Sequence, residues 1–338
     1  MISTASAKNS SSFSPSAKQS LLTANEVTIH TFPNGTALEN LAIRANGQVL
    51  TTVSTSPDLY LFNPVVDSAP VTLVHTFPGY SSLLGIVEVQ PDQFYVVAGN
   101  FSWATLSSTP GSFSIFHVDM AQFPYSINVT KTADFPEGGL LNGLCLFSKE
   151  EGLIYVADSF AGVVSLLQVD TGVHYVAVNL TLTNGVNGTS GIEAIGVNGV
   201  HVFQPPTTNG TATKYLYFSN TARALLARVP IDDTGAAVGE TEVLASDLIM
   251  DDFTLDDEGN VFQAVFGSNE VVRIDAVTGN VTVLAGNVNS TELRAATSVQ
   301  FGRTESEKGI AYVTTNGGVD ETMQVGGALK MIELGILA

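Results

Sequence analysis

One phrase of apolar runs and turns recurs along the chain and constrains its fold more than any other feature. In residues 251–266 an acidic pair opens an apolar run, a turn of Asp, Glu, Gly and Asn follows, and a second apolar run closes the phrase. Two such runs around a Gly/Asn turn predict an antiparallel hairpin, and residues 271–275 extend it to a third strand. The same phrase occurs at 39–53 and 142–158, so the chain is built from repeats.

The spacing of the repeats predicts the architecture. Aligning each unit on its opening position gives spacings of 45, 58, 51, 58 and 46 residues between six openings: Glu39, Leu84, Asn142, Glu193, Asp251 and Thr297. Periods near 50 residues that contain only strands are typical of a β-propeller with about four strands per blade. We therefore expect an all-β fold, a six-bladed β-propeller with four-stranded antiparallel blades.

A second repeat predicts how the ring closes. The sequence Ile-His-Thr-Phe-Pro at 29–33 reappears as Val-His-Thr-Phe-Pro at 74–78. The second copy would be the outermost strand of blade one, so the first should be the outermost strand of the last blade, beside residues 329–334. This N-terminal strand would leave no free sheet edge at the seam. We expect residues 1–25 to be a flexible tail and residues 26–338 to form the propeller.

Composition narrows the range of partners. The chain has 338 residues, a formal net charge of −19 and only 13 Lys and Arg residues, which argues against nucleic acid because phosphate binding depends on these cations. No apolar run is long enough to span a membrane. We expect small apolar or amphipathic substrates as partners, and the oligomeric state stays open.

The cellular location is left open between two alternatives. The first 25 residues are rich in Ser and Ala and have no apolar core, so they do not form a signal peptide. Nine Asn-X-Ser/Thr sequons are nevertheless present, at Asn9, Asn34, Asn100, Asn128, Asn179, Asn187, Asn209, Asn280 and Asn289. Their number suggests a glycoprotein of the secretory pathway whose leader has been removed, and a cytoplasmic protein is the alternative.

Chemistry is expected at one mouth of the central channel, where each first strand starts and each second strand ends. Three opening positions there, Glu39, Asn142 and Asp251, are the candidate catalytic residues. Their oxygens could hold a hard divalent cation, carry protons or bind a polar substrate, or they could only cap strand ends and bind channel water. The candidate substrate-binding residues around them are Leu84, Asn100, Phe101, Trp103, Asp158, Phe160, Glu193, Phe253, Phe266 and Thr315.

No familiar catalytic motif accompanies these residues. The chain has no Gly-X-Ser-X-Gly, no phosphate-binding loop, and no pair of histidines at His-X-X-X-His spacing. Cys145 is the single cysteine and lies in an alternating apolar run, so we expect a buried hydrophobe there and no disulfide.

From about residue 26 onward the chain resembles the SMP-30/gluconolactonase/luciferin-regenerating-enzyme family. The resemblance lies in the repeat openings at Glu39 and Asn142, in residues 154–159, and in Asp251 of the blade-five phrase. The resemblance implies that a Glu, two Asn and an Asp hold a calcium or zinc ion that polarises a sugar lactone. Leu84 stands where the resemblance implies the blade-two Asn, and no arginine lies near it. We therefore expect no resident metal, or weak calcium binding; if a metal is present, Glu39, Asn142 and Asp251 would hold it.

Residues 39–50 and 57–62 resemble more narrowly the fungal members of this superfamily that act as hetero-Diels–Alderases in tropolone-sesquiterpenoid biosynthesis. This resemblance implies a cofactor-independent cyclase, a pericyclase that joins a tropolone-derived quinone methide to a humulene-type alkene. Glu39, Asn142 and Asp251 would orient the tropolone, and the aromatic residues would form walls for the alkene. Two alternatives stay open: a divalent-metal-dependent lactonase or esterase, and a non-catalytic propeller scaffold.

Overall fold

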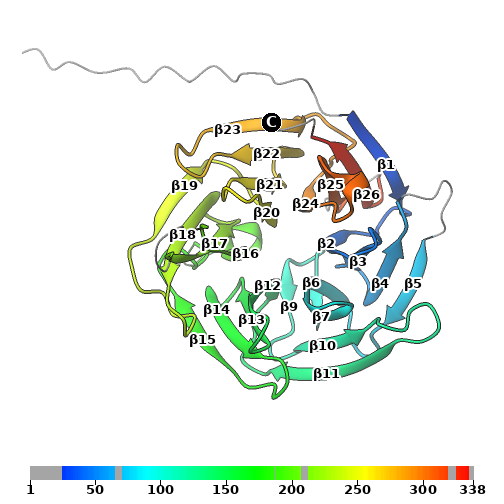
Figure 1. The fold of residues 1–338 in the computed structure, drawn as a ribbon, viewed down its shortest axis with the longest axis horizontal. Helices are drawn as coiled ribbons and strands as arrows, with labels where there is room; N and C mark the ends of the chain where they lie inside the picture. Colours follow the sequence, from blue (N-terminus) through cyan, green and yellow to red (C-terminus); the bar gives the residue numbers. More distant parts are fainter. Residues whose placement is uncertain (1–24, 65–70, 187, 207–211, 319–324, 335–338) are drawn as a thin grey trace, which may run out of the picture.

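The chain folds into six antiparallel four-stranded sheets arranged as blades around a central channel (Figure 1). The computed structural model describes residues 25–64, 71–186, 188–206, 212–318 and 325–334. The six-bladed β-propeller predicted from the repeat spacing is confirmed. Because each blade begins at the channel and ends at the rim, the opening positions of the repeats lie near one another although they are about 50 residues apart in sequence.

Blades one to three follow the predicted order. Blade one consists of β2 (Leu38–Ile43), β3 (Val49–Val53), β4 (Asp58–Phe62) and β5 (Thr72–Thr76). Blade two consists of β6 (Ser82–Gln90), β7 (Gln93–Gly99), β10 (Phe113–Asp119) and β11 (Asn128–Phe135), with a short hairpin, β8 (Phe101–Ser102) and β9 (Ser107–Ser108), inserted after β7. Blade three consists of β12 (Leu141–Ser148), β13 (Leu153–Asp158), β14 (Val163–Gln168) and β15 (His174–Asn179).

Blades four to six complete the ring. Blade four consists of β16 (Val197–Phe203), β17 (Lys214–Asn220), β18 (Leu225–Ile231) and β19 (Glu242–Ser246), preceded by the 3-10 helix η1 (Gly191–Ala194). Blade five consists of β20 (Phe253–Leu255), β21 (Val261–Val265), β22 (Glu270–Ile274) and β23 (Val281–Gly286). Blade six consists of β24 (Ala296–Phe301), β25 (Ile310–Thr315), β26 (Ala328–Glu333) and β1 (Asn25–Thr31), with η2 (Glu305–Glu307) between its first two strands.

The N-terminal strand closes the ring, as the repeated His-Thr-Phe-Pro sequence predicted. Strand β1 pairs antiparallel with β26, with Val27 opposite Met331 and Thr31 opposite Ala328. Figure 1 shows the blue β1 beside the red β26. Blade six therefore joins the two ends of the propeller, and unfolding β1 would expose the edge of β26. The predicted tail, residues 1–25, lies outside the described residues apart from Asn25.

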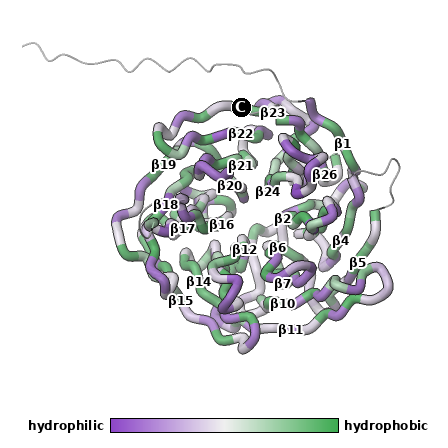
Figure 2. The backbone as a smooth tube through the Cα atoms, in the orientation of Figure 1, coloured by the Kyte–Doolittle hydropathy of each residue, from purple (hydrophilic) through white to green (hydrophobic). Residues whose placement is uncertain are grey.

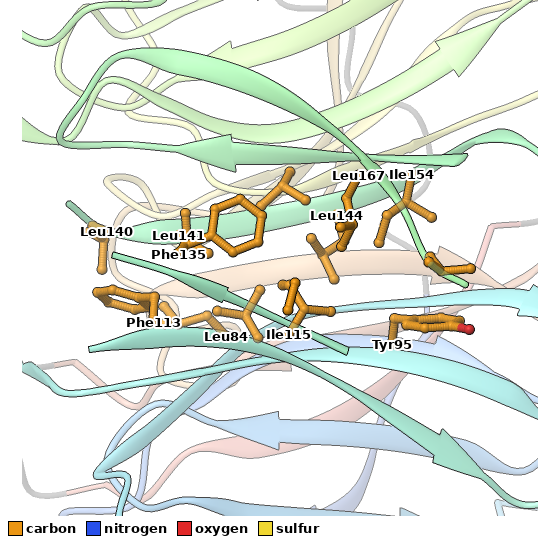
Figure 3. Packing of buried hydrophobic residues seen from close by; sticks show 14 of the residues in the cluster. Leu84, Tyr95, Phe113, Ile115, Phe135, Leu140, Leu141, Leu144, Ile154 and Leu167 are labelled. Carbon is orange, nitrogen blue, oxygen red and sulfur yellow. The ribbon is translucent and has the colours of Figure 1, made fainter. Parts of the chain in front are cut away.

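The core is divided among the interfaces between blades. Apolar residues are spread over all six blades, without gathering in a single layer (Figure 2). Between blades two and three, Leu84, Phe113, Ile115 and Phe135 of blade two pack with Leu141 and Leu144 of blade three (Figure 3). Cys145 is buried, as predicted, and packs between blades three and four. Within the part of the chain that the structure describes, no helix is long and apolar enough to cross a membrane.

Candidate functional site

A small cavity at one mouth of the channel brings together polar residues from four blades and an apolar wall. Its lining consists of Glu39, Leu84, Phe101, Trp103, Leu140, Asn142, Ile192, Ile195, Asn198, Thr221, Asp251 and Phe266. The space free for a water-sized molecule is only about 20 Å³, which is room for about one water. The side chains therefore fill most of the cavity in this conformation.

Four oxygen atoms in this cavity are buried and have no hydrogen-bond partner in the described structure: Glu39 Oε2, Asn142 Oδ1, Asn198 Oδ1 and Asp251 Oδ1. A buried acceptor without a partner costs about 1–3 kcal/mol. Four of them lining a single cavity indicate a site made for a ligand that supplies positive charge or hydrogen-bond donors.

The side-chain nitrogens of Asn142 and Asn198 are engaged in hydrogen bonds outside the set of four oxygens. Asn142 Nδ2 donates to Ser159 Oγ at 3.2 Å, and Asn198 Nδ2 donates to Thr221 Oγ1 at 2.9 Å. Because each nitrogen is engaged in its own blade, each amide has its oxygen free of protein donors. The set therefore consists of hydrogen-bond acceptors, unless a carboxyl is protonated.

Protonation of the carboxyls is favoured when no cation is bound. Burial first, and the nearby Asp252 charge second, raise the pKa of Glu39 to about 8. Burial also raises the pKa of Asp251 well above its ordinary value, with further contributions from the charges of Glu39 and Asp252. Near neutral pH an empty site would therefore hold at least one neutral carboxyl, which can donate a hydrogen bond.

Glycines beside the opening positions allow the inner strands to approach closely. A Cβ atom on Gly85 would lie 2.2 Å from the carbonyl oxygen of Asn142, and one on Gly143 would lie 2.5 Å from that of Asn198. No other residue fits there without moving a strand, so the sequence Asn142-Gly143 sets the spacing of the ring as well as supplying a ligand atom.

The roof of the cavity comes from the hairpin inserted in blade two. Trp103 Nε1 donates to Ser54 Oγ of blade one at 2.8 Å. The Trp103 ring lies parallel to Phe266 of blade five, with 6.4 Å between ring centroids and 4° between planes, and meets Phe101 edge-on at 5.1 Å. Ile192 of η1 completes the cover. The aromatic mouth predicted around Trp103 is thus present in the structure.

Seven of the predicted site residues line this cavity: Glu39, Leu84, Phe101, Trp103, Asn142, Asp251 and Phe266. The others do not line it. Asp158 is buried and accepts from the backbone amides of Gly139 and Leu140 at 2.8 and 2.9 Å, so it supports the loop that carries Leu140 into the wall. Phe253 packs against the His201 ring at 4.7 Å in the core between blades four and five.

The remaining predicted residues also have structural contacts. Thr315 Oγ1 accepts from the Ala328 amide at 3.0 Å and fastens β25 to β26. The carbonyl of Asn100 accepts from the Thr109 amide at 2.8 Å and closes the base of the inserted hairpin. Phe160 is half-buried against the apolar cluster between blades two and three.

Glu193 does not open blade four, which corrects the predicted ring. It is exposed on η1, and the residue that lines the cavity from this blade is Asn198 in β16. The spacings from Asn142 to Asn198 and on to Asp251 are then 56 and 53 residues, in place of 51 and 58. Asn198-Gly199-Val200 matches Asn142-Gly143-Leu144, a signal that could have identified Asn198 from the sequence.

The same correction changes the argument about a missing ligand. We expected Leu84 to leave the metal site with one oxygen ligand fewer than four. Asn198 instead supplies the fourth oxygen, and Leu84 belongs to the apolar wall of the cavity. Among the described residues, no group of three His, Cys, Asp or Glu side chains could hold a metal ion. The carboxylates of Glu39 and Asp251 together with two amide oxygens nevertheless fit the preference of a hard divalent cation for oxygen.

Comparison with known proteins gives two kinds of relative. The chain is 26% identical over 335 residues to "Putative hetero-Diels-Alderase asR5" of Sarocladium schorii, covering 85% of this chain and 77% of that protein. It is also 26% identical over 326 residues to "Putative hetero-Diels-Alderase" of a Phoma species, covering 85% of this chain and 86% of that one.

Solved structures share the fold over most of the chain. The structure of a luciferin-regenerating enzyme matches with a TM-score of 0.64 at 14% identity, over 93% of this chain and 96% of that one. The calcium-binding protein regucalcin from Agrobacterium tumefaciens matches with a TM-score of 0.61 at 18% identity, over 93% and 97%. Residues 208–317 match the SMP-30/Gluconolactonase/LRE-like region. The chain is thus similar to the SMP-30/Gluconolactonase/LRE-like region over residues 208–317, and along most of its length to two proteins named as hetero-Diels–Alderases.

Proposed function

We propose that the protein is a pericyclase of the hetero-Diels–Alderase type that joins a tropolone-derived quinone methide to a humulene-type alkene. The relatives' names favour this class because the matches extend over 85% of the chain. The observation that carries the proposal is the composition of the cavity: acceptor oxygens together with aromatic and aliphatic side chains, with no cysteine, histidine or lysine among the lining residues.

The polar side of the cavity would orient the oxygen-bearing partner. The four unpartnered oxygens can accept hydrogen bonds from substrate hydroxyl groups. A protonated Glu39 or Asp251 can donate to the substrate oxygen that gains negative charge as the new bonds form. The same carboxyl can give its proton to a departing hydroxyl when water is lost to form the quinone methide.

The apolar side would hold the alkene. Leu84, Trp103 and Phe266 line the same cavity as the carboxyl groups, and the Trp103 ring lies parallel to Phe266. Fixing two partners in one reactive arrangement converts a bimolecular step into an effectively unimolecular one. An apolar wall is sufficient for this role, since a cycloaddition requires neither a nucleophile nor a covalent intermediate. We propose that the reaction itself needs no cofactor.

A divalent-metal-dependent lactonase or esterase is the second candidate, and the four unpartnered oxygens favour it. Glu39, Asn142, Asn198 and Asp251 would hold the ion, and a cation at this place would polarise the carbonyl oxygen of a bound ester. The match of residues 208–317 to the SMP-30/Gluconolactonase/LRE-like region is compatible with this candidate too.

The deciding experiment supplies a hydroxymethyl tropolone and humulene to the purified protein, with and without a chelator. A pericyclase gives more adduct, with a defined stereochemistry, than a no-enzyme control, and the chelator leaves the rate unchanged. Adduct formation indistinguishable from the control would reject this function. Hydrolysis of a sugar lactone that stops with chelator and returns with calcium would instead establish the second candidate.

A further inference from the structure

The cavity is too small for the substrates of any function considered above. Pockets for small molecules usually enclose about 300–1,000 Å³, whereas the free space here is about 20 Å³. The floor and sides are strands of the rigid blades, whose residues Glu39, Asn142 and Asp251 are buried in the ring. Substrate entry therefore requires part of the roof to move.

The inserted hairpin is a short part of the roof. Strands β8 and β9 pair only through Phe101 with Ser108 and Ser102 with Ser107. Its tip, residues 104–105, is exposed. It reaches across the mouth from blade two, and Trp103 contacts blades one and five through Ser54 and Phe266. Moving Trp103 away would open the cavity on the side of Phe266.

Ser54 is suited to hold Trp103 in the closed position. Its side chain is buried at the end of β3, with 1% exposure. Its Oγ donates to the carbonyl of Ala37 at 3.3 Å and accepts from Trp103 Nε1 at 2.8 Å. Because the hydroxyl proton is directed to Ala37, a lone pair is left for the indole, which fixes the height and tilt of the ring over the cavity.

We propose that the β8–β9 hairpin is a movable roof over the site and that Ser54 is a positioning residue which latches Trp103 in the closed state. The movement follows from the geometry alone. The nature of the molecule admitted, an apolar or amphipathic substrate that the Trp103 and Phe266 rings then cover, rests on the proposed function. In the closed state the rings would exclude water and fix the face of the alkene that meets the heterodiene.

The experiment uses the fact that Trp103 is the single tryptophan of the chain, so its fluorescence reports on the roof without interference. In Ser54→Ala the loss of one hydrogen bond should shift the equilibrium toward the open roof by up to about tenfold. We expect red-shifted emission and an acrylamide quenching constant that rises about twofold or more. Ser54→Thr, which keeps the hydroxyl, should restore values near those of the unmodified protein.

A matched control separates the latch from a general loss of stability. Ser114 is also a buried serine, in β10, and hydrogen-bonds Tyr80 and Asp134 away from the cavity. Ser114→Ala should leave the fluorescence unchanged even if it lowers the melting temperature. Unchanged emission and quenching in Ser54→Ala, with Ser114→Ala equally silent, would overturn the proposal.

A second measurement follows the reaction. If the hydrogen bond from Trp103 to Ser54 is the latch, Ser54→Ala and Trp103→Phe should lower stereoselectivity to a similar extent, and the double variant should be no worse than either single one. Additive effects would contradict a shared latch. If the fluorescence of Ser54→Ala changes as expected but the unmodified protein forms no adduct, the movable roof is established and only the pericyclase function is rejected. The two failures are therefore distinguishable.

Discussion

Replacing Glu39 with glutamine should stabilise the metal-free protein at alkaline pH, although Glu39 is a candidate catalytic residue. Its carboxyl is buried, its Oε2 has no partner in the described structure, and its pKa is raised to about 8 by burial and by Asp252. Glutamine has almost the same shape and carries no charge. The variant therefore avoids the free energy that the native side chain needs to ionise inside the protein.

The pH dependence follows from the direction of the shift. An unfolded glutamate titrates near pH 4.5, so between that pH and about 8 the folded state binds more protons than the unfolded state. The free energy of unfolding then falls as pH rises through this window, by up to about 1.4 kcal/mol per pH unit. The loss of unfolding free energy, to which Glu39 and Asp251 both contribute, should reach a few kcal/mol at pH 8–9 and vanish below pH 4.5.

The measurement is urea unfolding of both proteins in chelator at pH 4.5, 7 and 8.5. Glu307→Gln is the matched control, since Glu307 is also buried but its pKa is lowered, through hydrogen bonds from Thr304, Tyr312 and Arg303 that outweigh its burial. That substitution should destabilise at neutral and alkaline pH, the opposite sign. A Glu39→Gln protein that is less stable than the unmodified one at pH 8.5, or a difference that does not change with pH, would refute the reasoning.

Three further predictions concern ring closure, calcium and catalysis. Deleting residues 1–33 should remove β1, expose the edge of β26 and lower the melting temperature strongly, whereas deleting residues 1–22 should change it little; equal melting temperatures would contradict closure by β1. If a calcium ion binds at the four oxygens, calcium should raise the melting temperature of the unmodified chain, and this shift should be strongly reduced in Asn198→Leu. In Glu193→Gln the shift should equal that of the unmodified chain. Trp103→Ala or Phe266→Ala should lower the rate of adduct formation and yield a mixture of product stereoisomers. Asp251→Asn should slow turnover by about 10²–10⁴-fold if this carboxyl transfers the proton in dehydration, but far less if it only binds the tropolone. Product analysis against a no-enzyme control tests both expectations.

The sequence alone determined the architecture, because a propeller blade is a local unit. Each hairpin is encoded by apolar runs and Gly/Asn turns within about 50 residues, so the number of blades follows from counting repeats. The ring closure followed from the repeated His-Thr-Phe-Pro sequence, since equivalent strands carry equivalent residues. Three of the four cavity oxygens, those of Glu39, Asn142 and Asp251, were identified because these residues open their repeats at equivalent positions.

The tertiary structure decided which side chains face the cavity. Glu193 and Asn198 are both polar residues at an acceptable spacing, and the structure places Asn198 in β16, facing the cavity, and Glu193 on the surface of η1. Phe253 and Phe266 are both aromatic, but Phe253 packs in the core between blades four and five, whereas Phe266 directly follows β21 and lines the cavity. Ser54 meets Trp103 from another blade, 49 residues away in sequence. A contact of this kind depends on how blades pack around the channel, and no local sequence pattern encodes it.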